Sequence, residues 1–365
     1  MNAVAALRST PPKGVAWLRA NLFGSPWQSV LTLVVLVLAG IAVERAVAWL
    51  IIDASWRGDS PAACRGATGA CWPFIKVRLG QLFYGLYPVS ERWRVDVGLL
   101  GTLGVIVAVV GSRGRLRQVM ALLLLFVVPP AAIILFRGGV GGLAVVATSQ
   151  WGGFFLTLVV SGFVLAVSLP TGVLLALGRN SSLPLLRTVC AAWIEWWRAV
   201  PVLVLLFVVI IMFPLFMPHG VEVDKLTRAL VALSVVMSCY IAEAVRGALL
   251  GLARGQYEAA AALGLGYWRT TGLVILPQAL KTATPQITST FIGLFKETTL
   301  LLVIGFSDLL GMVFVAASDP QWLDVDALTT GFVFVGLFFW IWCFALSRVS
   351  AGLERRLARS QQPRA

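Results

Sequence analysis

Six charged side chains interrupt apolar stretches of this sequence, and their chemistry needs an explanation. They form three close pairs: Glu195 with Arg198, Glu243 with Arg246, and Lys296 with Glu297. An ionisable group inside a membrane costs about 2.5–3.5 kcal/mol on insertion scales. Such residues are therefore expected to pair with one another or to serve a polar substrate.

The first two pairs could neutralise each other. Each lies about 6–14 Å from the same end of its own predicted membrane span, and the two spans are antiparallel neighbours. We expect Glu195 to pair with Arg246, and Arg198 with Glu243. The alternative keeps each pair within its own helix at i,i+3 spacing, with the arginines extending to the headgroups. The sequence leaves both arrangements open.

The third pair lies deeper, near the middle of its span by the same helical rise. Gln286, Thr290, Gly293 and Glu297 fall at i, i+4, i+7 and i+11, on one helix face. This polar stripe, with Lys296 beside it, predicts a path for a zwitterion whose ammonium would meet Glu297. The alternative is contact between helices through small and polar residues.

Several chemistries are excluded or left open by the remaining reactive residues. His219 is the only histidine, which excludes a metal or catalytic cluster built on several histidines. We expect no catalytic residues and no metal. Cys64 and Cys71 lie in a polar loop, where a disulfide and two free thiols are equally compatible with the sequence. Three further cysteines lie in apolar runs and are expected to be buried: Cys190, Cys239 and Cys343.

The composition indicates that lipid is the natural solvent of this chain. Hydrophobic residues make up 59% of the 365 residues and charged residues only 12%, whereas a soluble domain has roughly a quarter charged residues. The net charge of +13 comes from arginines between apolar runs, which is typical of orientation signals rather than of nucleic-acid binding.

A membrane-spanning helix needs about 20 apolar residues. Eight segments qualify or nearly qualify, at about 30–52, 97–111, 119–136, 153–178, 189–216, 228–250, 285–306 and 327–347. The first is longer than the apolar part of a signal peptide, so we interpret it as a retained span.

Basic residues predict the orientation of these spans. Arg113, Arg115 and Arg117 lie between the second and third segments, and excess positive charge marks cytoplasmic loops. Alternation then places both termini and the 251–284 loop in the cytoplasm, and the acidic 307–326 loop outside. The 53–96 loop is an exception, because it falls outside and yet holds six basic residues.

The loop that follows the sixth span predicts a short helical elbow. Glu258 precedes four alanines, which favours a helix, and Gly264 and Gly266 then interrupt it. A second short helix can start at Tyr267. Such an elbow on the cytoplasmic surface could fit a groove on a partner. The alternative is an elbow that only joins two spans.

The elbow also carries a motif. The sequence resembles the signature loop of ABC importer permeases at seven positions: Glu258, Ala259, Ala260, Gly264, Val274, Leu276 and Pro277. Val274 stands where isoleucine is usual, which keeps a β-branched apolar group. The resemblance implies that this loop is the coupling helix, which docks on a separate ATPase subunit.

Other segments narrow the resemblance to the polar amino acid permeases. Residues 195–201, with Ala199 in place of glycine, and residues 242–247, 255–258 and 293–298 are similar to segments of that family. Residues 69–72 and 87–94 resemble the outer loop of the M-type permease subunit of general L-amino acid transporters. The resemblance implies a cytoplasmic ATPase dimer that carries ATP and Mg, a second homologous permease subunit and a periplasmic amino-acid-binding protein, all working in membrane lipid.

The sequence as a whole predicts an all-α integral membrane protein with about eight transmembrane helices. Residues 1–151 form a three-helix extension with an outer loop near 53–96, residues 152–350 a five-helix type I importer core, and residues 351–365 a basic cytoplasmic tail. We expect the chain to lie in a bacterial inner membrane.

The predicted function is import of L-amino acids from periplasm to cytoplasm, with no enzymatic activity in this chain. None of its five lysines lies in a phosphate-binding Gly-x-x-x-x-Gly-Lys-Ser/Thr loop, so the energy must come from another subunit. The alternative is a secondary transporter driven by an ion gradient. That class usually has repeated halves, and three plus five spans do not divide that way.

Overall fold

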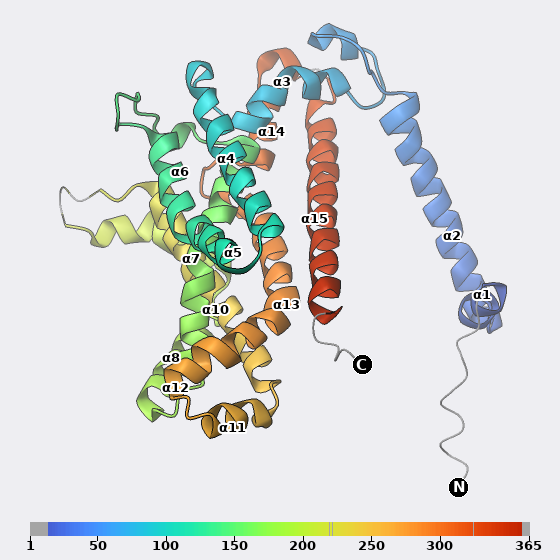
Figure 1. Cartoon of the computed structure of the whole chain (residues 1–365). Coiled ribbons are helices and arrows are strands. Elements are labelled where there is room, and N and C mark those ends of the chain that lie inside the picture. The colour runs from blue at the N-terminus through green and yellow to red at the C-terminus, as the bar shows by residue number, and fades with distance from the viewer. Residues whose placement is uncertain (1–13, 219, 221, 324, 360–365) are drawn as a thin grey trace. The chain divides into compact units, whose positions relative to one another are not determined.

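The computed structural model describes residues 14–218, 220, 222–323 and 325–359. His219, Asp324 and the first thirteen residues lie outside this range, as do residues 360–365 of the predicted tail. The described chain is helical, with isolated β-bridges only (Figure 1). The all-α prediction is confirmed.

The chain folds into two compact units. Unit 1 holds Met1–Lys76 and Gln321–Thr330, and unit 2 holds Val77–Pro320 and Gly331–Ala365. The predicted division into 1–151, 152–350 and 351–365 follows sequence blocks rather than spatial contact, and it stays a prediction.

Unit 1 begins with a short helix and a long apolar one. These are α1, Val15–Leu22, and α2, Pro26–Val47, which continues as a π-helical turn over Ala48–Ile52. Ser25 caps α2 by accepting a hydrogen bond from the Gln28 backbone N–H at 3.2 Å, and Pro26 fits the first helical position.

A disulfide-closed loop follows α2 in unit 1. Cys64, at the end of the 3₁₀ turn Pro61–Cys64, is joined to Cys71, with their Cα atoms 5.6 Å apart. The loop folds back on the end of α2, because Ala70 N–H donates to the Trp49 carbonyl at 2.9 Å. Of the two alternatives for these thiols, the structure contains the bonded one.

Unit 2 contains most of the helices. In chain order these are α3 (Trp72–Tyr84), which starts in unit 1, α4 (Arg92–Gly111), α5 (Gly114–Leu122), α6 (Val128–Arg137), α7 (Gly153–Arg179), α8 (Pro184–Ala199), α9 (Val202–Phe207), α10 (Lys225–Leu250), α11 (Arg254–Ala262), α12 (Tyr267–Arg269), α13 (Leu276–Glu297), α14 (Leu309–Ala317) and α15 (Ala327–Arg359), which also starts in unit 1.

Shorter elements join or extend these helices. The 3₁₀ turns are Val89–Glu91, Thr148–Gln150, Phe213–Phe216, Thr298–Leu302 and Pro320–Trp322, and the π-helical segments of unit 2 are Leu123–Val127, Val208–Met212 and Thr270–Ile275.

Six helices of the described chain are long and apolar enough to cross a membrane, or seven if one bent pair counts as a span. They coincide with seven of the eight predicted segments. The remaining segment, 285–306, falls on α13 and the 3₁₀ turn after it. Helix α13 starts nine residues earlier than predicted, as the continuation of the π-helical segment Thr270–Ile275.

The predicted fifth span is not a continuous helix, which corrects the 189–216 prediction. It divides into α8 and a second segment, Val202–Phe216, that meet at an angle of 94°. The break falls at Val200, whose backbone is extended, just before Pro201. A residue that precedes proline is disfavoured in helical conformation. The charged residues of α8 therefore lie on a helix separate from the span that follows.

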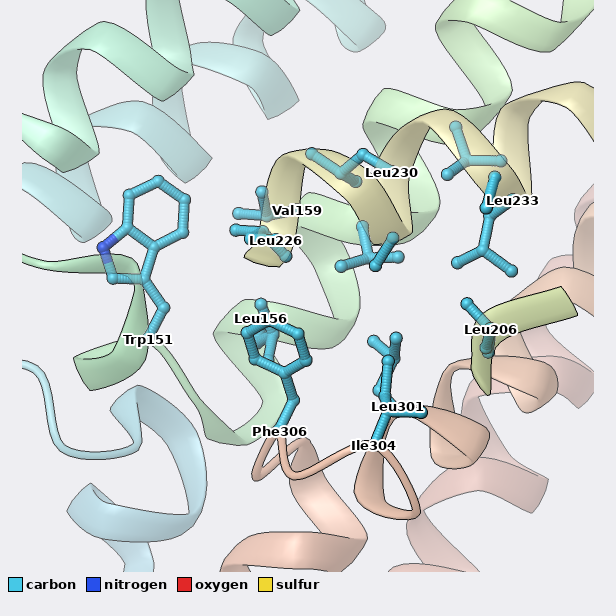
Figure 2. Packing of buried hydrophobic residues seen from close by; sticks show 14 of the residues in the cluster. Trp151, Leu156, Val159, Leu206, Leu226, Leu230, Leu233, Leu301, Ile304 and Phe306 are labelled. Atoms are coloured by element: carbon cyan, nitrogen blue, oxygen red, sulfur yellow. The ribbon is translucent and has the colours of Figure 1, made fainter. Parts of the chain in front are cut away.

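The core of unit 2 forms around α7 and α10, which pack along each other more extensively than any other pair of helices. Trp151, Leu156 and Val159 from the α7 side meet Leu226, Leu230 and Leu233 of α10 (Figure 2). Leu206, Leu301, Ile304 and Phe306 complete the cluster. Between membrane helices such packing stabilises through close van der Waals contact.

One end of unit 2 is closed by buried polar contacts. The Tyr87 hydroxyl donates to the Phe136 carbonyl at 2.7 Å, and Arg94 donates to the Ala144 carbonyl at 2.7 Å. Arg94 is 1% exposed and forms an ion pair with Glu91 at 2.5 Å. Residues 87–94, which resemble an outer-loop motif, thus fix the start of α4.

The same contacts account for much of the basic excess in the 53–96 loop. Besides Arg94, Arg78 pairs with Asp319 within unit 2, and Lys76 pairs with Asp59 at 2.6 Å within unit 1. A paired arginine or lysine carries little net positive charge, so it is a weak orientation signal.

Candidate functional site

The elbow predicted after the sixth span is present, and its first helix is α11. Gly264 ends that helix with a φ of +69°, in the left-handed region that favours glycine. Leu265 N–H donates to the Ala260 carbonyl at 3.1 Å and Gly264 N–H to the Ala261 carbonyl at 2.9 Å. This pair of bonds is a Schellman motif. Gly266 differs, with a φ of −69° that any residue can adopt.

The second arm of the elbow runs into the next long helix without a break. Helix α12 continues through the π-helical segment Thr270–Ile275 into α13. Val274 and Leu276 are half-buried in this arm, and Pro277 is exposed. The Gln278 amide donates to the Gln256 side chain at 3.1 Å and so ties the two arms together.

The residues of the signature divide into an anchor and an exposed surface. Ala260 is 3% exposed and packs against the protein, whereas Glu258 and Ala259 are exposed. Four large side chains beside them are also exposed, Leu263 at 79%, Tyr267 at 60%, Trp268 at 79% and Leu273 at 72%. We call these four residues the elbow face. Of the four, the rings of Tyr267 and Trp268 contact each other, with centroids 5.2 Å apart. Large apolar side chains exposed outside the hydrocarbon favour contact with a partner.

A charge network links three helices at the same end of unit 2. Glu243 of α10 lies at its centre, where it accepts hydrogen bonds from Arg179 at 2.9 Å and Arg246 at 2.9 Å and forms a longer ion pair with Arg198 at 3.6 Å. Arg179 also reaches Glu195 of α8 at 2.8 Å. The side chain of Glu195 is 66% exposed, so its pair is weak, whereas that of Glu243 is 18% exposed.

This geometry corrects the expected pairing in part. Arg198 does face Glu243, but the structure has no Glu195–Arg246 pair; Arg246 bonds to Glu243 within its own helix. Arg179 was missed as a member of the network. It ends α7 and is 64 residues from Glu243 in sequence. Its position at the end of an apolar run is the only sequence signal it carries.

Only some residues of the polar stripe on α13 are exposed and able to contact a substrate. Gln286 is exposed, and the Thr290 hydroxyl donates to the Gln286 carbonyl at 3.0 Å, so it is already satisfied within the helix. A Cβ at Gly293 would meet no atom within 4 Å. Glu297 is half-buried, and its Oε2 has no hydrogen-bond partner in the described part of the chain.

The side chain of Lys296 does not lie on the same helix face as the polar stripe. It is exposed, and it lines a separate cavity of about 520 Å³ with Thr299, Phe314 and Phe339. Adjacent residues on a helix point about 100° apart. Lys296 and Glu297 therefore do not act at one spot, although they are neighbours in sequence.

The elbow and the closed end lie at opposite ends of unit 2. Helices α8, α11 and α12 lie together at one end, and α14 lies at the other (Figure 1). Asp308, which caps α14, is fully buried and accepts from the Gly311 N–H at 2.9 Å. Burial raises the pKa of this carboxyl from 3.8 to about 6, against the lowering effect of its backbone hydrogen bonds.

Comparison with known families identifies the class of protein. The profile of the family described as "Binding-protein-dependent transport system inner membrane component" matches residues 168–359, which is more than half of the chain. The chain belongs to this family. It is a multi-pass inner membrane component of a transport system, and this membership decides against the ion-gradient-driven alternative.

Individual relatives match over nearly the full length. The inner membrane amino-acid ABC transporter permease protein YhdY of Escherichia coli K12 is 43% identical over 96% of this chain and 95% of its own. The glutamate/glutamine/aspartate/asparagine transport system permease protein BztC of Rhodobacter capsulatus is 34% identical over 95% of this chain and 94% of its own. The predicted resemblance to ABC permeases of the polar amino acid family is confirmed.

Among solved structures, a crystal structure of an amino acid ABC transporter with histidines is similar to part of the chain. The identity is 27% and the TM-score 0.49, over 56% of this chain and 92% of the solved one.

Proposed function

We propose that this chain is the permease subunit of an ATP-driven importer that moves L-amino acids from the periplasm to the cytoplasm. The names of the two relatives support the substrate class, since both are permeases of amino-acid transport systems and match nearly all of this chain. A broad range of polar amino acids is the predicted substrate set.

The elbow face is the observation that carries the mechanism. Large apolar side chains such as Trp268 are not normally left exposed at the aqueous end of a membrane protein. Anchored by Ala260 and turned by Gly264, the elbow face would dock in a groove of the ATPase. Glu258, Ala259, Val274, Leu276 and Pro277 shape the same elbow.

The energy would come from ATP and Mg bound on that ATPase dimer. Closure of the dimer would move the elbow, and unit 2 would switch between inward-facing and outward-facing states. A second, homologous permease subunit would complete the path, and a periplasmic binding protein would deliver the amino acid. The orientation needed is the predicted one, with 251–284 and both termini cytoplasmic.

The α13 stripe offers two roles for the substrate path. The unpartnered Oε2 of Glu297 favours contact with a substrate ammonium. The internal hydrogen bond of Thr290 favours helix contact instead. Uptake that survives Glu297→Ala unchanged would remove the path role and leave the importer assignment intact.

Co-purification tests the docking step. The tagged full chain, solubilised from its host membrane, should bring down an ATPase with a phosphate-binding lysine loop, identified by mass spectrometry. The double variant Leu263→Ser/Trp268→Ser should lose that ATPase, because it removes apolar area from the elbow face and leaves the fold untouched.

A matched control separates docking from general damage. Leu323→Ser changes a leucine that is 65% exposed in the 307–326 loop, and it should retain the ATPase. Equal recovery of the ATPase by all three proteins would contradict the proposed docking surface.

A further inference from the structure

An apolar cavity lies within unit 2, between helices α4, α5 and α6 and the core helices α7 and α13. Its volume is about 490 Å³, within the roughly 300–1,000 Å³ of pockets that hold drug-sized organic molecules. Leu99 and Ile106 of α4, Ala132 of α6 and Ala166 of α7 form its walls, and Phe291 of α13 contributes from one side.

The lining of this cavity is unsuited to a zwitterion. Thr102 contributes the only side-chain hydroxyl, and that hydroxyl donates to the Gly98 carbonyl at 2.7 Å. No charged side chain lines the cavity. A polar guest would lose its water without gaining hydrogen bonds, so the cavity selects an apolar guest.

Three arginines lie just beyond one end of the cavity. Ala121 lines the cavity and lies four residues after Arg117 on α5, which is about 6 Å along a helix. Arg113, Arg115 and Arg117 are exposed, and none has an acidic partner among the residues that the structure describes. Gly114, with a φ of +57°, makes the tight turn that carries them.

The size of the cavity suits a lipid chain. Ala121 and Ala132 both line it and are eleven residues apart on the α5–α6 arm, about 17 Å at the helical rise. One leaflet of a bilayer core is about 15 Å thick, half of the full 30 Å. The arginines would therefore stand at headgroup depth when the cavity lies in the hydrocarbon.

We propose that this cavity binds one acyl chain of an anionic phospholipid whose phosphate is held by Arg113, Arg115 and Arg117. The apolar walls exclude water from the chain, and the arginines neutralise the headgroup. With the orientation proposed above, the lipid belongs to the cytoplasmic leaflet. The lipid would join helices α4, α5 and α6 to the core of unit 2.

Native mass spectrometry of the full chain tests the headgroup contact. Delipidated protein is titrated with phosphatidylglycerol and with phosphatidylcholine of the same acyl chains. We expect tighter binding of phosphatidylglycerol by wild type, and a loss of this preference in Arg113→Gln/Arg115→Gln/Arg117→Gln. Each arginine near a headgroup contributes about fivefold in affinity. Equal binding of both lipids by wild type would overturn the proposal.

A pair of glycine variants tests the cavity. Gly162 lines the cavity, and a Cβ there meets no atom within 4 Å, so Gly162→Leu projects into the empty space. Gly104 of α4 has the same free space but does not line the cavity, which makes Gly104→Leu the matched control. Only Gly162→Leu should weaken phosphatidylglycerol binding, by about tenfold or more if the chain is excluded.

A photoactivatable phosphatidylglycerol locates the site independently. With the reactive group on its acyl chain, labelling should fall on peptides from 99–136 and 158–169 and on the peptide that holds Phe291. Labelling elsewhere, or undiminished binding by Gly162→Leu, would show that the lipid does not occupy this cavity. Neither result would bear on the importer assignment, which ATP-driven uptake tests.

Discussion

The two ends of unit 2 differ in which side chains they bury and which they expose. At the closed end, around Tyr87, Arg94 and Asp308, polar groups are buried and bonded within the chain. At the elbow end, Leu263 and Trp268 are each 79% exposed. The closed end bonds its buried polar groups within the chain, except for Arg94 Nε and Asp308 Oδ2, which have no hydrogen-bond partner among the described residues. The elbow end leaves large apolar side chains uncovered.

This difference predicts which property a substitution should change at each end: stability at the closed end, and partner binding and transport at the elbow end. A buried charge that loses its partner is strongly destabilising, so substitutions at the closed end should act on stability. Substitutions of exposed side chains change stability by about 0.5 kcal/mol or less. Variants of the elbow face should therefore act on partner binding and transport.

The largest expected effect is at Arg94. Arg94→Met leaves Glu91 and the Ala144 carbonyl without their partner, at a cost of about 3–5 kcal/mol in the free energy of unfolding. Thermal unfolding in detergent measures the loss. Arg92→Met is the control, because Arg92 is half-buried, stacks over Tyr84 at 4.8 Å and donates only one long hydrogen bond, to the Tyr87 carbonyl at 3.5 Å. Similar losses in both variants would contradict the closed-end account.

Asp308 should give a pH-dependent effect. Its pKa is about 6 in the fold and 3.8 ordinarily, so the folded chain holds this proton more tightly than the unfolded chain. Its contribution to stability is therefore full below pH 3.8 and falls as the pH rises to about 6. The loss above pH 6 is about 3 kcal/mol.

Asp308→Asn should remove that slope and keep the cap, since asparagine also accepts at a helix start. The variant should gain stability over wild type as the pH rises from 4 to 7.5, measured by thermal unfolding. Asp59→Asn, at an exposed carboxylate, serves as the control. A constant difference across this pH range would count against a buried, protonated Asp308.

Alanine substitutions of the two elbow glycines, Gly264 and Gly266, should have different effects. Gly264→Ala forces alanine into left-handed backbone, at about 1–2 kcal/mol, whereas Gly266→Ala should be neutral. Because the strain falls on the α11 turn, ATPase recovery should fall in the first variant only. Equal recovery from both variants would show that the Schellman turn does not set the docking geometry.

The smallest expected effect is in the exposed part of the charge network. A double-mutant cycle of Arg179→Gln and Glu195→Gln should give a coupling of about 0.2–1 kcal/mol in thermal or denaturant unfolding. The cycle of Arg246→Gln and Glu195→Gln should give almost none. A larger coupling in the Arg246–Glu195 cycle than in the Arg179–Glu195 cycle would support the Glu195–Arg246 pair predicted from the sequence.

The sequence predicted the elbow because the signal is local. Alanines 259–262 favour helix and Gly264 ends it, so neighbouring residues alone decide the structure. The long apolar helices were likewise recognisable from composition. The break at Pro201 carried a local signal as well, but the high overall hydrophobicity of 189–216 outweighed it.

The charge network could not be derived in the same way. Arg179 meets Glu243 across 64 residues of sequence, and nothing near either residue indicates that contact. The burial of Arg94 is similar, since its acceptor Ala144 is 50 residues away. Both contacts depend on how helices pack, which periodicity does not determine.

ATP-driven uptake tests the central claim most directly. Proteoliposomes would hold the full chain with its second permease subunit and ATPase, and a binding protein would deliver labelled amino acid. We predict that Leu263→Ser/Trp268→Ser lowers uptake at least about tenfold, since losing docking contacts worth 1.4 kcal/mol already gives that factor, while Leu323→Ser leaves it unchanged. Undiminished uptake by the double variant would contradict the claim that the elbow face transmits the energy of ATP.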